Sequence, residues 1–523
     1  MEEGTRGDLL DGTIPRMLDR VAREHAHRTA IEEGEIRISY FELSFGARRI
    51  TAALMAAGIK PGDRVAIWAP NCWEWISVAL GIHGAGAVLV PLNTRYKGIE
   101  AATILNQSRA RLLFTIQGFL DTDYLALLAA VGSECPHLER TVLLRGDGGI
   151  SLNAFIDLGQ GQDPERVWSQ VRPEDPSDVL FTSGTTGAPK GAVCHHGQTL
   201  RAYSDWAHVV GLKTEDRYLV VAPFFHCFGY KAGWLAALLS GATILPQAVF
   251  DAGQVLERIG PDRVTMLPGP PALYQSLLAH PGLGDHDISS LRLAVTGAAV
   301  IPVELIQRMR ETLGFETVIT GYGLTEACGI ATMCRHGDDD ETIATTSGRA
   351  IPGVEVCVVD RDGSACPAGE PGEILVRGYN LMSGFLHDDV ATAQAIDAEG
   401  WLHTGDIGIL NEAGNLRITD RLKDMFIVGG FNAYPAEIES IILRREDVAQ
   451  VAVIGVPDER LGEVGIAFVV PSGTAFVDEL ELRDWCRAHM ANFKVPRRVE
   501  VVEALPMNAT GKVTKFVLRE WIA

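Results

Sequence analysis

One short segment, rich in glycine and hydroxyl side chains, stands out as a candidate site for chemistry. It reads TSGTTGAPKG over residues 182–191 and follows the apolar run DVLF. Glycines let a backbone turn tightly and direct successive N–H groups at one anion, while hydroxyl groups add donors and a lysine adds positive charge. The segment therefore predicts a phosphate-binding loop. Its spacing of Gly184, Gly187 and Lys190 differs from that of the G-x-x-x-x-G-K-[ST] nucleotide loop.

The composition describes a large, acidic protein. The chain has 523 residues, which predicts more than one folding unit at about 150 residues per domain. Hydrophobic residues make up 47% and charged residues 22%, values typical of a soluble globular protein. The net charge is -21 and lysines and arginines do not cluster, so we expect no nucleic-acid partner.

The sequence predicts a cytoplasmic protein without a membrane span. The first residues, MEEGTRGDLLDG, lack the apolar stretch of a secretory signal. The most apolar run, residues 75–93, contains His83, Pro91 and glycines, so we interpret it as a buried helix, a turn and a strand. The nine cysteines form no CxxC pair, which favours a reducing compartment. The neighbouring His195 and His196 are interpreted as structural residues rather than metal ligands.

Alternating strand and helix patterns predict an α/β fold. The run RVAIWAPN, residues 64–71, indicates a strand that is followed by a helix ending near Gly84 and by the strand AVLVPL. A similar unit begins with RYLVVAPFFH, residues 217–226, and ends with ATILPQ. We therefore expect two related α/β subdomains.

The pattern changes after about residue 350. Two β runs around Gly- and Asp-rich turns, and a further pair at residues 407–421, predict hairpins and hence a β-rich subdomain. Helix and strand patterns beyond them predict a small α+β domain. The expected organisation is a large domain over residues 1–421, a hinge at 422–424 and a small mobile domain over 425–523.

At this point the sequence resembles a known family. The segment TSGTTGAPKG is similar to the phosphate loop of the adenylate-forming (ANL) superfamily, which includes acyl- and aryl-CoA synthetases, adenylation domains and luciferases. The other motifs of that superfamily follow in order across nearly the whole chain: GYGLTEA at 321–327, WLHTGD at 401–406, DRLKDMFIVGGFNAYPAEIE at 420–439 and PMNATGK at 506–512.

The resemblance implies an ATP site made from both predicted domains. Tyr322 would stack on adenine, and Thr325 would donate to the α-phosphate. Glu326, with Thr182, would hold Mg²⁺ among nucleotide oxygens. The residues assigned to ATP or AMP are Thr182, Ser183, Gly184, Thr185, Thr186, Gly187, Lys190, Gly297, Ala298, Ala299, Thr320, Gly321, Tyr322, Gly323, Thr325, Asp406, Arg421 and Lys512.

The resemblance gives Asp406 and Arg421 roles at the ribose, and it sets Thr320 apart from the family pattern. Asp406 would accept both ribose hydroxyl groups, and Arg421 would return to the same sugar or form a structural salt bridge. Thr320 departs from the family pattern, since many relatives carry Gln, Asn or Asp there, whose longer polar side chain makes the usual contact to adenine. The catalytic residues that the resemblance implies are Lys512, Thr325, Glu326 and His226.

The implied reaction has two steps. A carboxylate attacks MgATP to give acyl-AMP and pyrophosphate, and the thiol of CoA then displaces AMP. Lys512 would stabilise the charge that develops in the first step. The small domain would reorient about Lys423 between the steps, and Gly429 and Gly430 would leave room for the CoA arm. No carrier domain follows Lys512, which favours free CoA, and a homodimer stays open.

The segment APFFHCFGYKAGW is expected to line the acyl pocket. His226 would shield the reacting carboxylate, and the pocket would include Phe228, Ala232, Pro268 and Gly269. The segment has no acidic side chain for a substrate ammonium group, so a non-amino acid is favoured. Lys231 lies in an apolar run, where it would either extend to solvent or meet a polar substrate atom.

Three short sequence segments indicate which class of carboxylic acid the protein would activate. PFFHCFGYKAG, LPGPPALYQSLL and GGFNAYPAEIE are similar to an actinobacterial branch that activates the ring-derived propanoate of steroid degradation, beside fatty-acid–CoA ligases. The expected substrate is a bulky alicyclic propanoate, with Lys231 or Thr320 as a polar partner for its ring oxygens. A medium- or long-chain fatty-acid ligase, an acyl-AMP ligase that loads a separate carrier protein, and an inactive ATP-binding relative remain alternatives.

Overall fold

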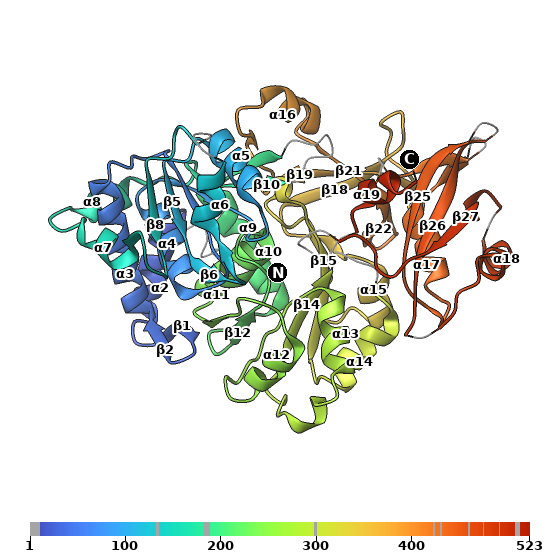
Figure 1. Ribbon diagram of the computed structural model, residues 1–523, viewed down its shortest axis with the longest axis horizontal. Helices are drawn as coiled ribbons and strands as arrows, with labels where there is room; N and C mark the ends of the chain where they lie inside the picture. The colour runs from blue at the N-terminus through green and yellow to red at the C-terminus, as the bar shows by residue number, and fades with distance from the viewer. Residues whose placement is uncertain are drawn as a thin grey trace. The chain divides into compact units, whose positions relative to one another are not determined.

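The protein divides into two compact units (Figure 1). A computed structural model describes residues 11–131, 135–182, 189–297, 301–421, 424–428, 431–458, 461–473, 475–490, 492–507 and 513–522. The first unit comprises Met1–Glu355 with Val376–Leu402, and the second comprises Val356–Leu375 with His403–Ala523. The predicted mixed α/β fold with a large and a small domain is confirmed. The predicted boundary at residues 422–424 stays a prediction.

An eight-stranded sheet forms the first α/β layer of unit 1. Its order is β20-β11-β10-β4-β3-β5-β8-β9, and the pairs from β10 to β9 are parallel. Strands β4 and β5 are buried along their whole length, which explains their apolar sequences VLVP and LLFT. The strands are β3 (Arg64–Trp68), β4 (Val88–Pro91), β5 (Leu112–Thr115), β8 (Arg140–Leu143), β9 (Ile150–Ser151), β10 (Pro176–Thr182), β11 (Lys190–His195) and β20 (Gly384–Phe385).

The most apolar run of the sequence lies inside this layer. It supplies the buried helix α4 (Trp73–Gly84), a turn at Gly86 with φ of 66°, and strand β4. The predicted order of helix, turn and strand is confirmed. Among the residues that the structure describes, helices of the length and hydropathy needed to cross a membrane are absent.

A second sheet carries the candidate site. Its two halves, β12-β13-β1-β2 and β14-β15-β16-β17, are joined by Met266, which makes parallel bridges to Tyr218 and Leu293. The predicted second α/β subdomain thus also recruits the hairpin β1-β2 from the start of the chain. The strands are β1 (Thr29–Glu33), β2 (Ile36–Ser39), β12 (Arg217–Val220), β13 (Thr243–Pro246), β14 (Leu293–Gly297), β15 (Thr317–Tyr322), β16 (Thr332–Met333) and β17 (Arg349–Ala350).

Helices surround these sheets. Helix α3, for example, begins with a capping box in which Ser39 and Glu42 bond each other's backbone N–H groups. The helices are α2 (Ile14–Glu24), α3 (Tyr40–Ala56), α5 (Gly98–Ser108), α6 (Tyr124–Ala130), α7 (Leu152–Asp157), α8 (Pro164–Gln170), α9 (His196–Val210), α10 (Cys227–Gly229), the π-helix η1 (Tyr230–Leu235), α11 (Ala236–Leu239), α12 (Ala252–Ile259), α13 (Pro271–Ala279), η2 (Leu283–Asp285), α14 (Val303–Glu311), η3 (Thr325–Ala327), α15 (Asp340–Thr345) and α16 (Asp389–Ala395), with the small hairpin β6 (Gln117–Phe119) and β7 (Thr122–Asp123).

The second unit includes most of a four-stranded sheet, β18-β19-β21-β22, and a five-stranded sheet covered by helices. Its core packs Phe426, Ile438, Val453 and Leu482 together. The elements are β18 (Val354–Val359), β19 (Pro371–Gly378), β21 (Leu402–Leu410), β22 (Leu416–Arg421), β23 (Phe426–Val428), β24 (Phe431–Ala433), α17 (Pro435–Ile442), β25 (Val448–Asp458), β26 (Gly462–Pro471), α18 (Glu479–His489), η4 (Asn492–Lys494), β27 (Arg498–Val501) and α19 (Lys515–Glu520). The predicted hairpins β18-β19 and β21-β22 are both present.

Candidate active site

Four parallel segments meet in the second sheet, in the order β12, Met266, β14 and β15. The backbone N–H of Leu219 donates to Met266 O at 3.0 Å, and that of Leu267 donates to Leu293 O at 3.0 Å. Because the segments are parallel, their carboxyl ends lie at one edge, where ligands of open α/β sheets bind. The chain leaves that edge through the predicted site segments 221–232, 268–269, 297 and 321–322.

The two predicted adenine segments are neighbours at this edge. Gly297 ends β14 opposite Gly321 of β15. A Cβ atom on Gly297 would lie 2.9 Å from Gly321 O, so the two backbones approach closely. Tyr322, predicted to stack on adenine, is 8% exposed. Ala298 and Ala299 lie outside the described residues.

A tight turn follows β15 and carries Thr325 and Glu326. The turn is the 3₁₀ helix η3, and the N–H of Gly329 closes it by donating to Leu324 O at 2.9 Å. Both Thr325 and Glu326 are partly exposed. Gly323 packs directly against the end of this turn, since a Cβ atom on Gly323 would lie 2.0 Å from Gly329 O. A carboxylate and a hydroxyl group are hard oxygen donors, so Glu326 and Thr182 have the chemistry that Mg²⁺ prefers.

The predicted phosphate loop is the connection of an antiparallel hairpin. Thr182 ends β10 and Lys190 begins β11, and the two residues are cross-strand partners. Thr182 Oγ1 donates to Lys190 O at 3.4 Å, and Lys190 Nζ lies 5.2 Å from the centroid of the Phe385 ring. The loop residues Ser183, Gly184, Thr185, Thr186 and Gly187 lie outside the described part of the chain.

The acyl segment begins at an exposed histidine. His226 caps helix α10, and its Nδ1 accepts a hydrogen bond from the N–H of Phe228 at 3.4 Å. Phe228 is partly exposed, whereas Ala232 is 2% exposed. Pro268 and Gly269 are buried, and the N–H of Gly269 donates to Val295 O at 3.0 Å. The histidine and the 268–269 wall therefore belong to segments that leave the same sheet edge.

Lys231 takes neither of the two positions that the sequence suggested. Its side chain is 0% exposed, and Nζ lies 2.9 Å from Oδ1 of Asp178, which is also 0% exposed. Nζ also donates to Cys328 Sγ at 3.3 Å. Burial is the largest influence and by itself would lower the pKa of Lys231, but the charge of Asp178 together with the thiols of Cys194, Cys328 and Cys227 raises that pKa well above its usual value. Lys231 therefore neither extends to solvent nor serves the substrate.

The hydroxyl group of Thr320 also bonds within the protein. Its side chain is buried, and Oγ1 lies 2.9 Å from both Ile343 O and Thr346 O and 3.0 Å from Cys334 Sγ. The expectation that Thr320 supplies a polar partner for a substrate ring was wrong. A backbone oxygen of helix α15, that of Ile343, accepts the hydrogen bond of this hydroxyl group instead.

Sequence reasoning missed Asp178 and Cys328. Asp178 lies in the apolar run DVLF, as Lys231 lies in the apolar segment GYKAGW. Lys231 is a single charge in an apolar stretch, and this signal called for a partner because buried charges need one. Asp178 gives no comparable signal, because Glu174 and Asp175 lie just before it.

The ribose pair lies in the second unit. Asp406 on β21 and Arg421 on β22 are cross-strand partners, so the hairpin brings the two predicted residues together. The N–H of Asp406 donates to Thr404 Oγ1 at 3.1 Å. Lys423, Gly429, Gly430 and Lys512 lie outside the described residues.

The neighbouring histidines His195 and His196 have different surroundings. His196 is fully buried, and its ring lies 5.3 Å from that of His83, while His195 is partly exposed. Among the described residues, groups of three or more side chains that would ligate a metal ion are absent. The nine cysteines are all free.

The buried histidine pair predicts acid sensitivity. Burial, with the charge of Lys231, lowers the pKa of His83 to about 3, and burial lowers the pKa of His196 well below its usual value. Because an unfolded histidine titrates near pH 6.5, the unfolded state binds more protons below that pH. The contribution of the two neutral histidines to the free energy of unfolding is therefore fully present above about pH 6.5. Toward lower pH the free energy of unfolding falls by up to about 1.4 kcal/mol per pH unit for each histidine.

Urea unfolding followed by tryptophan fluorescence between pH 7.5 and 5 measures how the free energy of unfolding depends on pH. His196→Gln should make this dependence weaker. The matched change His208→Gln, at an exposed position of α9, should leave it unchanged. Equal slopes in all three proteins would contradict the assignment.

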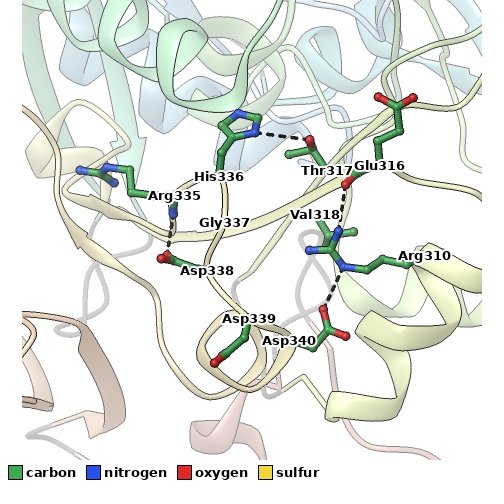
Figure 2. A pocket seen from close by; sticks show the side chains of 10 residues that line it. All are labelled: Arg310, Glu316, Thr317, Val318, Arg335, His336, Gly337, Asp338, Asp339 and Asp340. Atoms are coloured by element: carbon green, nitrogen blue, oxygen red, sulfur yellow. Dashed lines mark hydrogen bonds and ion pairs between the residues drawn. The ribbon is translucent and has the colours of Figure 1, made fainter.

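Figure 2 shows a polar pocket of about 410 Å³ away from these residues. It lies beside Thr317 and Val318, at the amino end of β15, whereas the adenine segment lies at the carboxyl end. Arg310 is held within the protein, because its Nε donates to Asp340 at 2.9 Å and its Nη1 donates to Glu316 O at 2.9 Å. We assign no ligand to this pocket.

Comparison with known families decides the identity of the site. Residues 18–386 match the model described as AMP-binding enzyme, and residues 437–512 match the AMP-binding enzyme C-terminal domain. The chain belongs to the AMP-binding enzyme family. The predicted adenylate-forming superfamily is confirmed, and the paired strand ends at Gly297 and Gly321 belong to its large domain.

Three similar proteins refine this placement. The chain is 50% identical to the 3-[(3aS,4S,7aS)-7a-methyl-1,5-dioxo-octahydro-1H-inden-4-yl]propanoyl:CoA ligase of Mycobacterium tuberculosis, over 97% of this chain and 98% of that protein. It is 47% identical to the ligase of the same name from Rhodococcus jostii, over 97% and 98%. The crystal structure of the anthranilate CoA ligase AuaEII with anthranoyl-AMP matches with a TM-score of 0.87 and 30% identity, over 97% of both chains.

The family match and the similar proteins together identify the class of reaction. The protein is an ATP-dependent acid–thiol ligase, an AMP-forming acyl-CoA synthetase with a carboxylic acid, ATP and CoA as substrates and Mg²⁺ as cofactor.

Proposed function

We propose that this ligase activates a bulky alicyclic propanoate, of the methyl-dioxo-octahydroindenyl kind, as its CoA thioester. The observation that supports this acid most directly is the pair of relatives at 50% and 47% identity over 97% of the chain, both named for that propanoyl group. The histidine and the wall at residues 268–269 supply an acyl segment next to the adenine segment at one sheet edge.

The proposed first step forms acyl-AMP. One carboxylate oxygen of the acid attacks the α-phosphorus of ATP, a new P–O bond forms, and the bond to pyrophosphate breaks. Thr325 donates to the α-phosphate, the backbone and hydroxyl groups of residues 182–187 with Lys190 hold the outgoing phosphates, and Lys512 balances the developing charge. Mg²⁺, held by Glu326 and Thr182, would neutralise charge on the nucleotide oxygens.

The second step forms the thioester. The CoA sulfur attacks the acyl carbon, loses its proton, and displaces AMP, which leaves with the bridging oxygen. Gly429 and Gly430 would give the CoA arm its path, and Asp406 with Arg421 would hold the ribose. Reorientation of the small domain about Lys423 between the steps is part of the proposal.

The acid preference predicts a measurable ratio. We expect kcat/KM for the ring propanoate to exceed that for octanoate by at least about tenfold, which is roughly 1.4 kcal/mol of differential transition-state binding. Since Lys231 and Thr320 are bonded within the protein, this discrimination is expected to come from the shape of the pocket. Initial rates of AMP release at several acid concentrations give both values.

A higher kcat/KM for octanoate or palmitate would overturn the proposed acid and favour the fatty-acid alternative. Turnover only with an added carrier protein, and none with CoA, would favour the carrier-loading alternative. Failure to release pyrophosphate with any acid would favour an inactive ATP-binding relative.

The cellular setting completes the proposal. We place the ligase in the cytoplasm on the evidence of its reaction, which uses ATP and CoA. Assembly as a homodimer stays a prediction, which light scattering of the purified protein would measure.

A further inference from the structure

The buried ion pair Lys231–Asp178 connects three motif-bearing segments of unit 1. Asp178 lies on β10, the strand that ends at Thr182, where the phosphate loop begins. Lys231 lies on the helix η1 that follows the His226 segment. The same ammonium group reaches Cys328 Sγ at 3.3 Å, and Cys328 is the C-terminal cap of the turn that carries Thr325 and Glu326.

The Cys328 turn needs support from outside itself. Cys328 has φ of 57°, a left-handed conformation that costs a non-glycine residue about 1 kcal/mol or more. Helix α9 holds it from one side, because Tyr203 Oη donates to Cys328 O at 2.9 Å and Thr199 Oγ1 lies 3.5 Å from its sulfur. Lys231 contacts the same sulfur from η1. The direction of the Glu326 side chain depends on a turn that these contacts hold.

The helix that presents Lys231 is itself unusual. Residues Tyr230–Leu235 form a π-helix, and Gly233 has ψ of -105°, outside the helical range. The π-helix is rare, appears mostly as a single turn inside an α-helix, and is frequent at functional sites. Here a regular α-helix would change the direction of the ammonium group relative to Asp178 and Cys328.

We propose that Lys231 is a positioning residue for nucleotide binding. Held by Asp178, it fixes the sulfur of Cys328 and thereby the turn that presents Thr325 and Glu326 to the nucleotide. This inference rests on the nucleotide-binding roles given to Thr325 and Glu326 in the proposed function.

The test must separate positioning from simple burial of charge. Removing one partner of a buried pair leaves an uncompensated charge and destabilises a protein strongly, whereas neutralising both partners is often tolerated. The informative protein is therefore the double variant Lys231→Met/Asp178→Asn. The amide oxygen that this variant carries at position 178 can still accept from Ser177 Oγ, as Asp178 Oδ2 does now at 2.7 Å.

Two readouts are needed besides activity. Calorimetric titration with Mg²⁺ and the β,γ-imido analogue of ATP should show affinity at least tenfold weaker than wild type. Hydrogen exchange at the amides of Cys328 and Gly329, which now bond Thr325 O at 3.0 Å and Leu324 O at 2.9 Å, should become at least tenfold faster. The thermal midpoint should stay within a few degrees of wild type.

The matched control neutralises another ion pair of the same unit. Arg292 Nη2 bonds Asp216 Oδ2 away from the motifs, so Arg292→Met/Asp216→Asn should leave analogue affinity and exchange at residues 328–329 unchanged. If the Lys231 double variant does not fold, Cys328→Ala removes the sulfur contact and leaves the ion pair intact, and it should weaken the analogue at least threefold.

Each outcome bears on the inference. Wild-type affinity and wild-type exchange in a folded double variant, or wild-type affinity in Cys328→Ala, would overturn the positioning role alone. A wild-type protein that does not bind the analogue would overturn the proposed function and this inference with it. Weakened affinity with faster exchange in the Lys231 variant, but not in the control, supports the role.

Discussion

Replacement of Lys512 by alanine is expected to slow acyl-adenylate formation by about 10²- to 10³-fold, the range found when one preorganised donor to a developing oxyanion is removed. The physical reason is that the proposed mechanism uses Lys512 only in the phosphorus chemistry, where the attacking carboxylate and the α-phosphate bring negative charges together. Thioester formation from supplied acyl-AMP should stay close to the wild-type rate. Pyrophosphate release and single-turnover thioester formation measure the two steps separately.

Lys494→Ala is the matched control, since Lys494 lies in the same unit and has no assigned role in either step. Both rates should remain at the wild-type value in that variant. Equal losses of adenylation and thioester formation in Lys512→Ala would contradict the role given to Lys512.

Replacement of Gly323 by alanine is expected to weaken nucleotide binding by about 10²-fold or more and to lower stability by about 1–3 kcal/mol, the usual cost of overpacking. The new Cβ atom would lie 2.0 Å from Gly329 O and 2.4 Å from Gly329 C. Both neighbours are backbone atoms, so the turn that carries Thr325 and Glu326 must shift. Calorimetric titration with the ATP analogue and urea unfolding measure the two effects.

Gly46→Ala is the matched control for this change. Gly46 lies within α3, and the space for its Cβ atom is open to 4 Å. Alanine at this position should be neutral or stabilise the protein by up to about 1 kcal/mol, because it lowers the conformational entropy of the unfolded chain. Nucleotide affinity equal to wild type in Gly323→Ala would contradict the close packing of the turn.

The positions of several site residues could be predicted because their signal is local. The strand before residue 182 and the strand after residue 190 flank a Gly-rich segment, and the structure pairs them as β10 and β11. Asp406 and Arg421 likewise flank a turn within one hairpin, which places them opposite each other. Turn chemistry and strand patterns within a short window are enough for such pairs.

The side-chain partners of Lys231 and Thr320 could not be predicted in the same way. Asp178 is far from Lys231 in sequence and meets it only after β10 and η1 pack together. Thr320 points toward α15, a helix that sequence patterns did not place beside β15. Long-range packing decides whether a polar side chain in an apolar run meets a ligand or a protein partner.

The central claim is that the protein joins a carboxylic acid to CoA through acyl-AMP. The most direct measurement uses the ring propanoate labelled with ¹⁸O in both carboxylate oxygens, together with MgATP and CoA, and follows the products by mass spectrometry. The account predicts acyl-CoA, unlabelled pyrophosphate and AMP that carries one ¹⁸O atom from the carboxylate. Formation of ADP with label in inorganic phosphate, or AMP without label, would contradict it.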